Sequence, residues 1–229
     1  IGGGATGAGC ALDAQLRGLK TVLLDAGDFA SATSSTSTKL VHGGVRYLQQ
    51  AIADLDLGQF NVVKRALHER RLMLDNAPFL AHPLELLVPC YSRTEVLYYR
   101  IGMKLYDLIA GRGNLFPSRY RTVKESVERM PMLNPAGLVG TVAYGDGQFD
   151  DTAYDIAILQ TFSAAGGETL NYARVVGLRK GPGGKLAEVE VEDQFSHRRF
   201  TVRARALSTR PVLSRITFGK WPSPVFRTG

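Results

Sequence analysis

The feature that most constrains the fold is a glycine-rich turn at the start of the chain, where residues 1–9 read IGGGATGAG. Gly2, Gly4 and Gly7 fit the pattern G-x-G-x-x-G, which joins a strand to a helix. The first glycine permits the tight turn, the second lets the backbone approach a pyrophosphate, and the third lets the helix pack close to the strand. A helix over 8–17 would direct its positive dipole end at the phosphates. The pattern predicts a dinucleotide-binding corner made by Gly2, Gly4, Ala5, Thr6 and Gly7.

An acidic residue stands where such a corner needs one. Asp25 ends an expected strand over 20–25, and it lies 18 residues after Gly7. That is close to the spacing of about 20 at which a carboxylate holds a ribose hydroxyl. An acid there favours NAD or FAD over NADP, but the turn does not separate NAD from FAD. A purely structural loop would explain the glycines and leave Asp25 unexplained.

The next segment, residues 28–48, is rich in hydroxyl side chains and has no hydrophobic period. One interpretation is a flexible Ser/Thr linker. A linker would not be expected to end in KLVHGGVRYL, which mixes charges, paired glycines and apolar residues. The segment resembles the TSSxSTKLxHGGxRYL signature of FAD-dependent glycerol-3-phosphate dehydrogenases, membrane-associated enzymes that reduce quinone. Residues 98–111, 131–133, 146–151 and 170–176 also resemble parts of that family.

The resemblance implies an α/β fold of the glutathione-reductase type. A Rossmann-type FAD-binding domain would comprise residues 1–77 and 146–206, and a β-sheet substrate domain would be inserted at 78–145. The chain begins inside the expected first strand, so we expect a fragment truncated at both ends.

The activity that the resemblance implies is oxidation of sn-glycerol 3-phosphate to dihydroxyacetone phosphate, with FAD as cofactor and ubiquinone as electron acceptor. A phosphorylated substrate calls for a guanidinium, and Arg46, with Tyr47 as a hydrogen-bond donor, is the best candidate. His42 is a weak candidate for the catalytic base. The residues expected beside FAD, besides the corner and Asp25, are Thr33, Ser34, Ser35, Ser37, Thr38, Lys39, His42, Gly43 and Gly44.

Partners and location also follow from the resemblance, which implies peripheral association with the mitochondrial inner membrane or, alternatively, the bacterial cytoplasmic membrane. A homodimer is a further expectation. The net charge of +7 could suggest nucleic acid, but residues 207–229 contribute four cations and no acid, which leaves +3 without them. Because no basic motif interleaved with aromatics is present, we expect no nucleic-acid partner. Cys10 and Cys90 lack metal-ligand spacing, and we expect no metal site.

Three other readings stay open. The protein could be a glycerol-3-phosphate oxidase that uses oxygen, or this chain could be a non-catalytic cofactor-binding fragment. An NAD-linked Rossmann enzyme is the third, and the hydroxyl-rich segment 31–38 argues against it. As a fragment, the chain is expected to be inactive by itself.

The resemblance stops after Ala206. One permitted coding of residues 207–221, read two bases later, gives Val-Asn-Ala-Thr-Gly-Pro, which is the family's expected continuation. Our hypothesis is that 207–229 is a frameshifted tail; the alternative is a genuine terminus.

Several local expectations bear on the site. His68, Arg70 and Arg71 are expected on a solvated helix face, and His82 in a turn before a short strand over 84–89. Thr122 and Glu125 have capping-box spacing. A helix over 95–111 is expected to pack its aromatics in the core rather than on a membrane. The remaining expectations are a strand at 138–144 followed by a turn at 145–151, a strand at 169–178, and a hairpin of 186–192 with 200–206.

Overall fold

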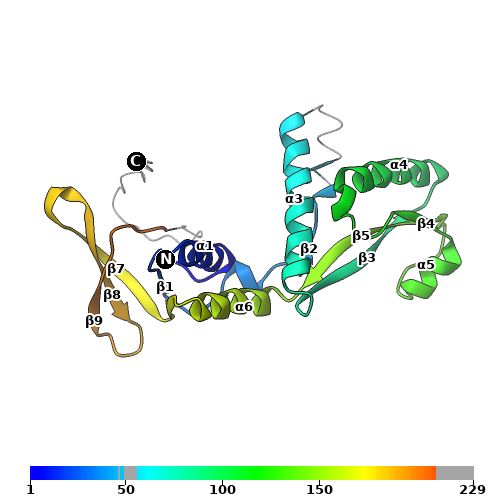
Figure 1. Ribbon diagram of the computed structural model, residues 1–229. Helices are drawn as coiled ribbons and strands as arrows, with labels where there is room; N and C mark the ends of the chain where they lie inside the picture. Colours follow the sequence, from blue (N-terminus) through cyan, green and yellow to red (C-terminus); the bar gives the residue numbers. More distant parts are fainter. Residues whose placement is uncertain (46, 49–55, 210–229) are drawn as a thin grey trace. The chain divides into compact units, whose positions relative to one another are not determined.

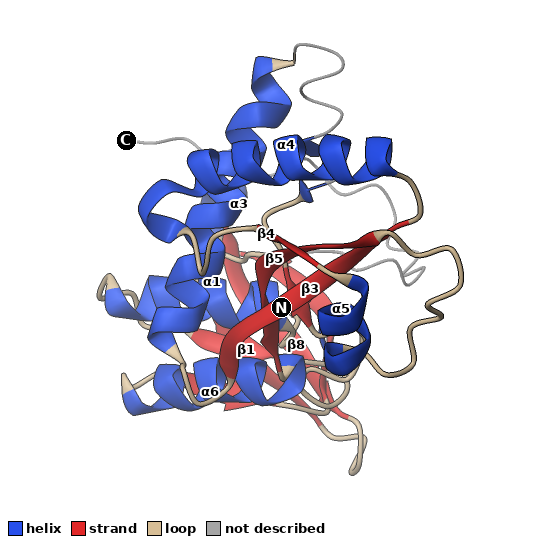
Figure 2. Cartoon of the chain, turned by 90° about the vertical axis from the view of Figure 1, so that its right-hand side faces the viewer, coloured by secondary structure: helices blue, strands red, loops and turns tan. Residues whose placement is uncertain are grey.

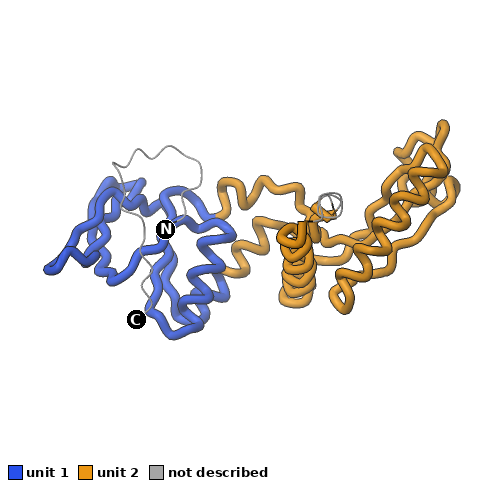
Figure 3. The backbone as a smooth tube through the Cα atoms, turned by 90° about the horizontal axis from the view of Figure 1, so that it is seen from above, with its two compact units in different colours: residues 1–29, 159–229 blue, residues 30–158 orange. Residues whose placement is uncertain are grey.

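The computed structural model describes residues 1–45, 47–48 and 56–209, and its elements fall into two units. Unit 1 comprises residues 1–29 and the chain from 159 onward, and unit 2 comprises residues 30–158 (Figure 3). The helix α6 (Asp151–Ala164) contributes residues to both units. The predicted domain boundaries at 77 and 145 differ from these divisions, and the assignment of segments to FAD and substrate domains stays a prediction.

Unit 1 contains the glycine-rich corner and two small sheets (Figure 1). The corner leads into α1, and the parallel pair β1–β6 is separate from the antiparallel sheet β7–β8–β9. The bounds are α1 (Ala5–Leu16), β1 (Val22–Leu24), β6 (Glu168–Leu170), β7 (Ala173–Lys180), β8 (Leu186–Asp193) and β9 (Arg199–Arg203), with a short 3₁₀ turn η3 (Pro182–Gly184). The expected hairpin is confirmed: Val189 and Val191 alternate into a small core with Leu24 and Ala173.

The prediction of a single strand over 169–178 is wrong in one respect, because this segment forms two strands, β6 and β7. Tyr172 has a φ of 51°, in the left-handed region. The amide of Tyr172 donates to the main-chain carbonyl of Gly27, and the amide of Ala173 donates to the main-chain carbonyl of Asp25. The chain therefore changes direction after pairing with β1 and enters a different sheet.

Unit 2 is built on a sheet in which β5 is central. The order is β2–β5–β3, and β4 also pairs with β5, all antiparallel. The bounds are β2 (Leu40–Val41), α3 (Leu57–Asn76), β3 (Ala81–Cys90), α4 (Arg93–Ala110), β4 (Arg119–Arg121), α5 (Val123–Arg129) and β5 (Gly140–Phe149), with 3₁₀ turns η1 (Thr33–Ser35) and η2 (Gly111–Gly113).

Helices cover both faces of this sheet. Met103 of α4 packs against Val142 of β5. Ser126 of α5 shares a 2.9 Å hydrogen bond with the neighbouring Thr141. Since successive residues of a strand point to opposite faces, α4 and α5 lie on different sides, as Figure 2 shows.

The turn expected over 145–151 is wrong for its first part, because β5 continues to Phe149. Gly145 and Gly147 disguise the strand in the sequence. A Cβ on Gly147 would lie 2.9 Å from the Leu74 side chain and 3.2 Å from the Val41 carbonyl oxygen, so close packing excludes a side chain there. His82 is likewise in β3 rather than in a turn, paired with Gln148. The prolines of β3 are tolerated because, among the described residues, β3 pairs only with β5.

The helix ends follow their capping residues. Ser92 and Glu95 form a capping box that starts α4 two residues before the expected position, and the predicted Thr122–Glu125 box is confirmed at α5. Asp56 caps α3 by accepting from the amides of Gly58 and Gln59. The sequence pattern predicts one or two helices over 49–76 with a break at 54–58, and residues 49–55 of that prediction lie outside the described residues.

The expected core packing of the α4 aromatic helix is only partly right. Met103 and Tyr106 are buried, whereas Leu97, Tyr98, Ile101 and Leu108 are between 55% and 77% exposed. One face of α4 therefore packs on the sheet while the opposite face is apolar and uncovered by the described residues. No helix in the described part of the chain is long and apolar enough to cross a bilayer.

Candidate functional site

The glycine-rich corner has the geometry that its sequence predicts. Gly2 has a φ of 98°, and its amide donates to the Leu24 carbonyl over 2.8 Å, which fixes the turn beside β1. A Cβ on Gly7 would overlap the carbonyl oxygen of Gly2. Gly4 is the N-cap of α1, and neither a capping side chain nor an acidic residue neutralises the first turn. The corner can therefore accept an anionic group at the positive end of the helix.

Asp25 lies against this corner, as expected, and has a structural task as well. Its carboxylate accepts from the amide of Gly3 through Oδ2 and from the amide of Gly27 through Oδ1, the latter over 2.8 Å. A carboxylate has about four lone-pair sites, so two remain for a ribose hydroxyl. Gly3 is a residue that the motif did not single out: a Cβ there would collide with the Phe29 ring. Corner and acid together fit the diphosphate and ribose of a dinucleotide.

The hydroxyl-rich segment belongs to unit 2 and is ordered around one buried carboxylate. Asp151, at the start of α6, is ion-paired with Lys39 and accepts from the amide and the hydroxyl of Ser37, over 3.1 and 2.7 Å. Lys39 also donates to the Ser35 carbonyl over 3.0 Å. Burial opposes ionisation of Asp151, but the hydrogen bonds from Lys39 and Ser37 outweigh it and hold its pKa well below the usual range. The segment is therefore a fixed structure and not a linker.

The rest of this predicted set lies close by within unit 2. Thr33, Ser37, Thr38 and His42 are exposed, and Ser34, Ser35 and Lys39 are half-buried. Gly43 and Gly44 are buried, and Gly44 has a φ of 79° with the Tyr47 ring packed against it. Tyr47 itself is 53% exposed and available to a ligand. Arg46, the predicted phosphate ligand, lies outside the described residues.

A buried charged network anchors this segment, and the sequence interpretation missed it. Arg70 was expected on a solvated face, yet its side chain is 0% exposed and donates to Asp146 over 2.7 Å. It also donates to the carbonyls of Gly145 and Gly113. A signal was present: Arg70 falls on the buried stripe of α3, in register with Val63, Leu67 and Leu74.

Asp146 and Tyr106 connect the network to the predicted site. The Gly43 amide donates to the Tyr106 hydroxyl over 3.0 Å and to Asp146 Oδ1 over 3.3 Å. Burial raises the pKa of Asp146, and Arg70 opposes that rise. Burial and the Asp146 charge raise the pKa of Tyr106 far above its ordinary value, and that of Tyr144 to about 12. The two tyrosines therefore stay protonated at neutral pH, and the Tyr106 hydroxyl donates to Asp146 Oδ1.

A second group of charges gathers on the other face of the sheet. Glu85 of β3 accepts from Arg121 over 2.7 Å, from Arg129 over 3.2 Å and from Arg119 over 3.3 Å. Arg121 is 7% exposed, and its Nε is buried without a hydrogen-bond partner. One carboxylate is thus shared by three guanidinium groups.

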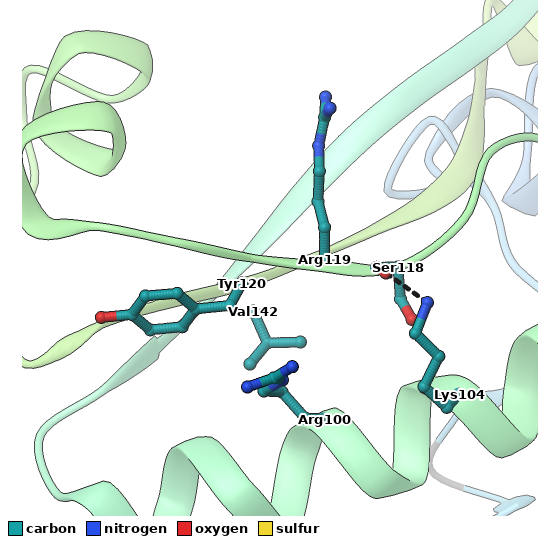
Figure 4. A pocket seen from close by; sticks show the side chains of 6 residues that line it. All are labelled: Arg100, Lys104, Ser118, Arg119, Tyr120 and Val142. Atoms are coloured by element: carbon teal, nitrogen blue, oxygen red, sulfur yellow. Dashed lines mark hydrogen bonds between the residues drawn. The ribbon is translucent and has the colours of Figure 1, made fainter.

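Two hollows formed by described residues of unit 2 lie away from the predicted residues. One of about 360 Å³ is formed between α4 and β4 by Arg100, Lys104, Ser118, Arg119, Tyr120 and Val142 (Figure 4). Lys104 donates to the Ser118 carbonyl across it over 2.6 Å, and the Arg119 side chain points away from α4. Another, of about 610 Å³, is lined by cations of α3 with Arg112. Neither hollow is lined by a predicted site residue, so the candidate residues are those of the corner within unit 1 and, separately, those of the described part of segment 33–47 within unit 2.

Comparison with known proteins gives consistent results. The sequence profile of the family described as "FAD dependent oxidoreductase" matches residues 1–222. Mitochondrial glycerol-3-phosphate dehydrogenase of Homo sapiens is 47% identical over 212 residues, covering 90% of this chain and 29% of that protein. The corresponding protein of Arabidopsis thaliana is 50% identical over 182 residues, covering 78% of this chain and 29% of that protein. The chain thus spans less than a third of the length of these curated relatives.

Solved structures agree on the fold. Glycerol-3-phosphate dehydrogenase from Bacillus halodurans, complexed with FAD, superposes with a TM-score of 0.63 at 31% identity, covering 90% of this chain and 32% of that one. L-alpha-glycerophosphate oxidase from Mycoplasma pneumoniae, with FAD bound, gives a TM-score of 0.60 at 16% identity, covering 82% and 47%. The predicted fold class is therefore confirmed as that of FAD-dependent oxidoreductases. The profile match continues into segment 207–229, whose frameshifted origin stays a hypothesis.

Proposed function

The chain belongs to the family of FAD dependent oxidoreductases, and we propose that the whole protein oxidises sn-glycerol 3-phosphate to dihydroxyacetone phosphate. The observation that carries this proposal is the identity of 47% over 212 residues with a mitochondrial glycerol-3-phosphate dehydrogenase. FAD, when bound, supplies the hydride acceptor that this oxidation requires. The chain's own residues hold and orient the two molecules.

The corner and Asp25 are assigned to the adenosine diphosphate part of FAD. The uncapped start of α1 offers its positive dipole end to the phosphates, and Gly7 keeps the helix close enough to β1 for that approach. The Asp25 carboxylate, already oriented by two amides, has acceptor sites left for a ribose hydroxyl.

The segment Thr33 to Gly44 is assigned to the flavin side of the cofactor, with Arg46 and Tyr47 as ligands of the substrate phosphate. The buried Asp151 and Asp146 fix this segment from behind, which leaves the side chains of Thr38 and His42 exposed on it. A guanidinium can bind a phosphate bidentately, and the Tyr47 hydroxyl can add a single hydrogen bond. The catalytic base stays unassigned, with His42 as the weak candidate.

Ubiquinone at a mitochondrial inner membrane is the electron acceptor that we propose. The names of the relatives support the mitochondrion. The exposed face of α4 that carries Leu97, Tyr98, Ile101 and Leu108 is apolar, as expected of a helix that lies on a membrane surface. A homodimer is a further part of this proposal.

The test is turnover by the full-length protein. We expect a yellow protein that reduces a quinone analogue when glycerol 3-phosphate is added, with little oxygen consumption. Oxygen consumption at the same rate without quinone would instead identify an oxidase. Expression of residues 1–229 alone tests the third alternative, a non-catalytic fragment. Flavin absorbance without turnover would identify this part as a cofactor-binding fragment.

A further inference from the structure

We propose that Arg70, Tyr106 and Asp146 are positioning residues that fix the main chain of Gly43, and through it the stretch His42–Gly44 that faces the flavin. This inference rests on the proposed function for the identity of the ligand. The contacts that carry it lie wholly within unit 2, on α3, α4 and β5.

The Gly43 amide is the point on which the three side chains converge. It donates to the Tyr106 hydroxyl over 3.0 Å and to Asp146 Oδ1 over 3.3 Å. The Tyr106 hydroxyl in turn approaches the same Oδ1 at 3.3 Å, and Arg70 donates to it over 2.7 Å. The one carboxylate oxygen therefore orients every polar group that reaches Gly43.

Steric contact removes the remaining freedom of Gly43. A Cβ at this position would overlap the Leu67 side chain and the Tyr106 hydroxyl. Immediately before it, Leu40 and Val41 pair with Gln148 and Gly147 of β5, the strand that also carries Asp146. The residues on either side of His42 are therefore both held by β5: Leu40 and Val41 by strand pairing, and Gly43 by Asp146.

A structural ion pair alone would not require this arrangement. Asp146 Oδ2 and Arg70 Nε are buried without hydrogen-bond partners, which costs free energy that an apolar core would avoid. Replacing buried ion pairs by packed apolar groups is often neutral or stabilising. An apolar pair, however, would remove the carboxylate that accepts from both the Tyr106 hydroxyl and the Gly43 amide. Orienting that hydroxyl and sharing that amide are tasks that only the charged arrangement performs.

The consequence for function is precision at the cofactor. A ligand placed by main-chain atoms loses productive geometry when those atoms shift by about 1 Å. His42, exposed beside the fixed Gly43, keeps one position relative to the flavin only while the network is intact.

The decisive variant is Tyr106→Phe in the full-length FAD-bound protein, because it removes one hydroxyl and keeps the ring. Tyr91→Phe, 51% exposed and two residues before the same helix, is the matched control. We expect Tyr106→Phe to shift the visible absorption bands of the flavin and to lower kcat about tenfold with KM nearly unchanged. Hydrogen–deuterium exchange of a peptide covering residues 40–45 should become faster. Tyr91→Phe should change none of these.

The inference would be overturned if Tyr106→Phe left the flavin spectrum, kcat and exchange as in Tyr91→Phe. It would also fail if kcat fell only in proportion to the unfolded fraction. Asp146→Asn, which keeps the shape and removes the charge, should reproduce the spectral shift; if it does not fold, Tyr106→Phe decides. A wild-type protein without flavin or without glycerol 3-phosphate turnover would refute the proposed function, and the exchange of residues 40–45 would still test the network.

Discussion

Arg70 and Asp146, separated by 76 positions in the sequence, form a 2.7 Å ion pair in which neither side chain is more than 1% exposed. The guanidinium brings α3 against β5, and the carboxylate holds the amide of Gly43. The stability of unit 2 and the shape of the candidate flavin segment therefore depend on the same pair.

Arg70→Leu should destabilise the protein strongly, because it leaves the Asp146 carboxylate buried without a counter-charge. Breaking a buried pair from one side costs about 3–5 kcal/mol. Arg71→Leu is the control: its pair with Asp75 is 44% and 51% exposed and should be worth less than about 1 kcal/mol. Chemical denaturation measures both. Equal losses for the two variants would contradict the structure, and a milder loss in Arg70→Leu/Asp146→Leu would support it.

Gly7→Ala should abolish binding of the cofactor, because the new Cβ would overlap the Gly2 carbonyl oxygen and open the corner. Gly9→Ala lies on the same helix with nothing within 4 Å of the added carbon, and should stabilise α1 by up to about 1 kcal/mol. The flavin absorbance of the purified variants is the measurement. Retention of full flavin content in Gly7→Ala would refute the assignment of the corner.

The Asp151 carboxylate should make stability depend on pH in acid. In an unfolded chain an Asp titrates near pH ~3.9. The folded state holds the pKa of Asp151 below that value, so its contribution is complete above about pH 4 and is lost as the pH falls towards the folded pKa. The difference in unfolding free energy between wild type and Asp151→Asn should be largest near neutral pH and shrink below about pH 4. A difference that grows on acidification would reverse the sign and contradict the assignment.

Glu85→Gln should destabilise unit 2, because three guanidinium groups lose their shared carboxylate while the side-chain shape is kept. Arg121 is nearly buried, so we expect a loss of about 2–3 kcal/mol. Glu128→Gln, whose pair with Lys124 is mostly exposed, serves as the comparison and should cost little. Thermal unfolding in low and high salt separates them, and similar melting temperatures would count against the cluster.

Sequence reasoning succeeded where the signal is local. The corner, the Thr122–Glu125 capping box and the hairpin around Val189 depend on residues a few positions apart. It failed where burial is decided by distant partners. Arg70 is read as a surface residue unless Asp146 is known to lie opposite it, and Gly145 and Gly147 are read as a turn unless their close neighbours are known.

The same limit applied to the candidate site. The residues Ser37, Lys39 and Gly43 could be chosen from their sequence pattern, but their anchors Asp151, Tyr106 and Asp146 could not. These contacts join positions more than 60 residues apart, where local periodicity carries no information. The exposed face of α4 was missed for a related reason, since a helix pattern shows an apolar stripe without showing what covers it.

Because β5 pairs with β2, β3 and β4, a change in the number of its residues would affect contacts on both faces of the sheet. Thr141 of β5 bonds Ser126 on one face of the sheet, and Asp146, five residues later, bonds Arg70 on the other. Deleting one residue between them would leave the ladder intact and turn the carboxylate to the wrong side. The number of residues between Thr141 and Asp146 therefore decides which face of the sheet receives the Asp146 carboxylate.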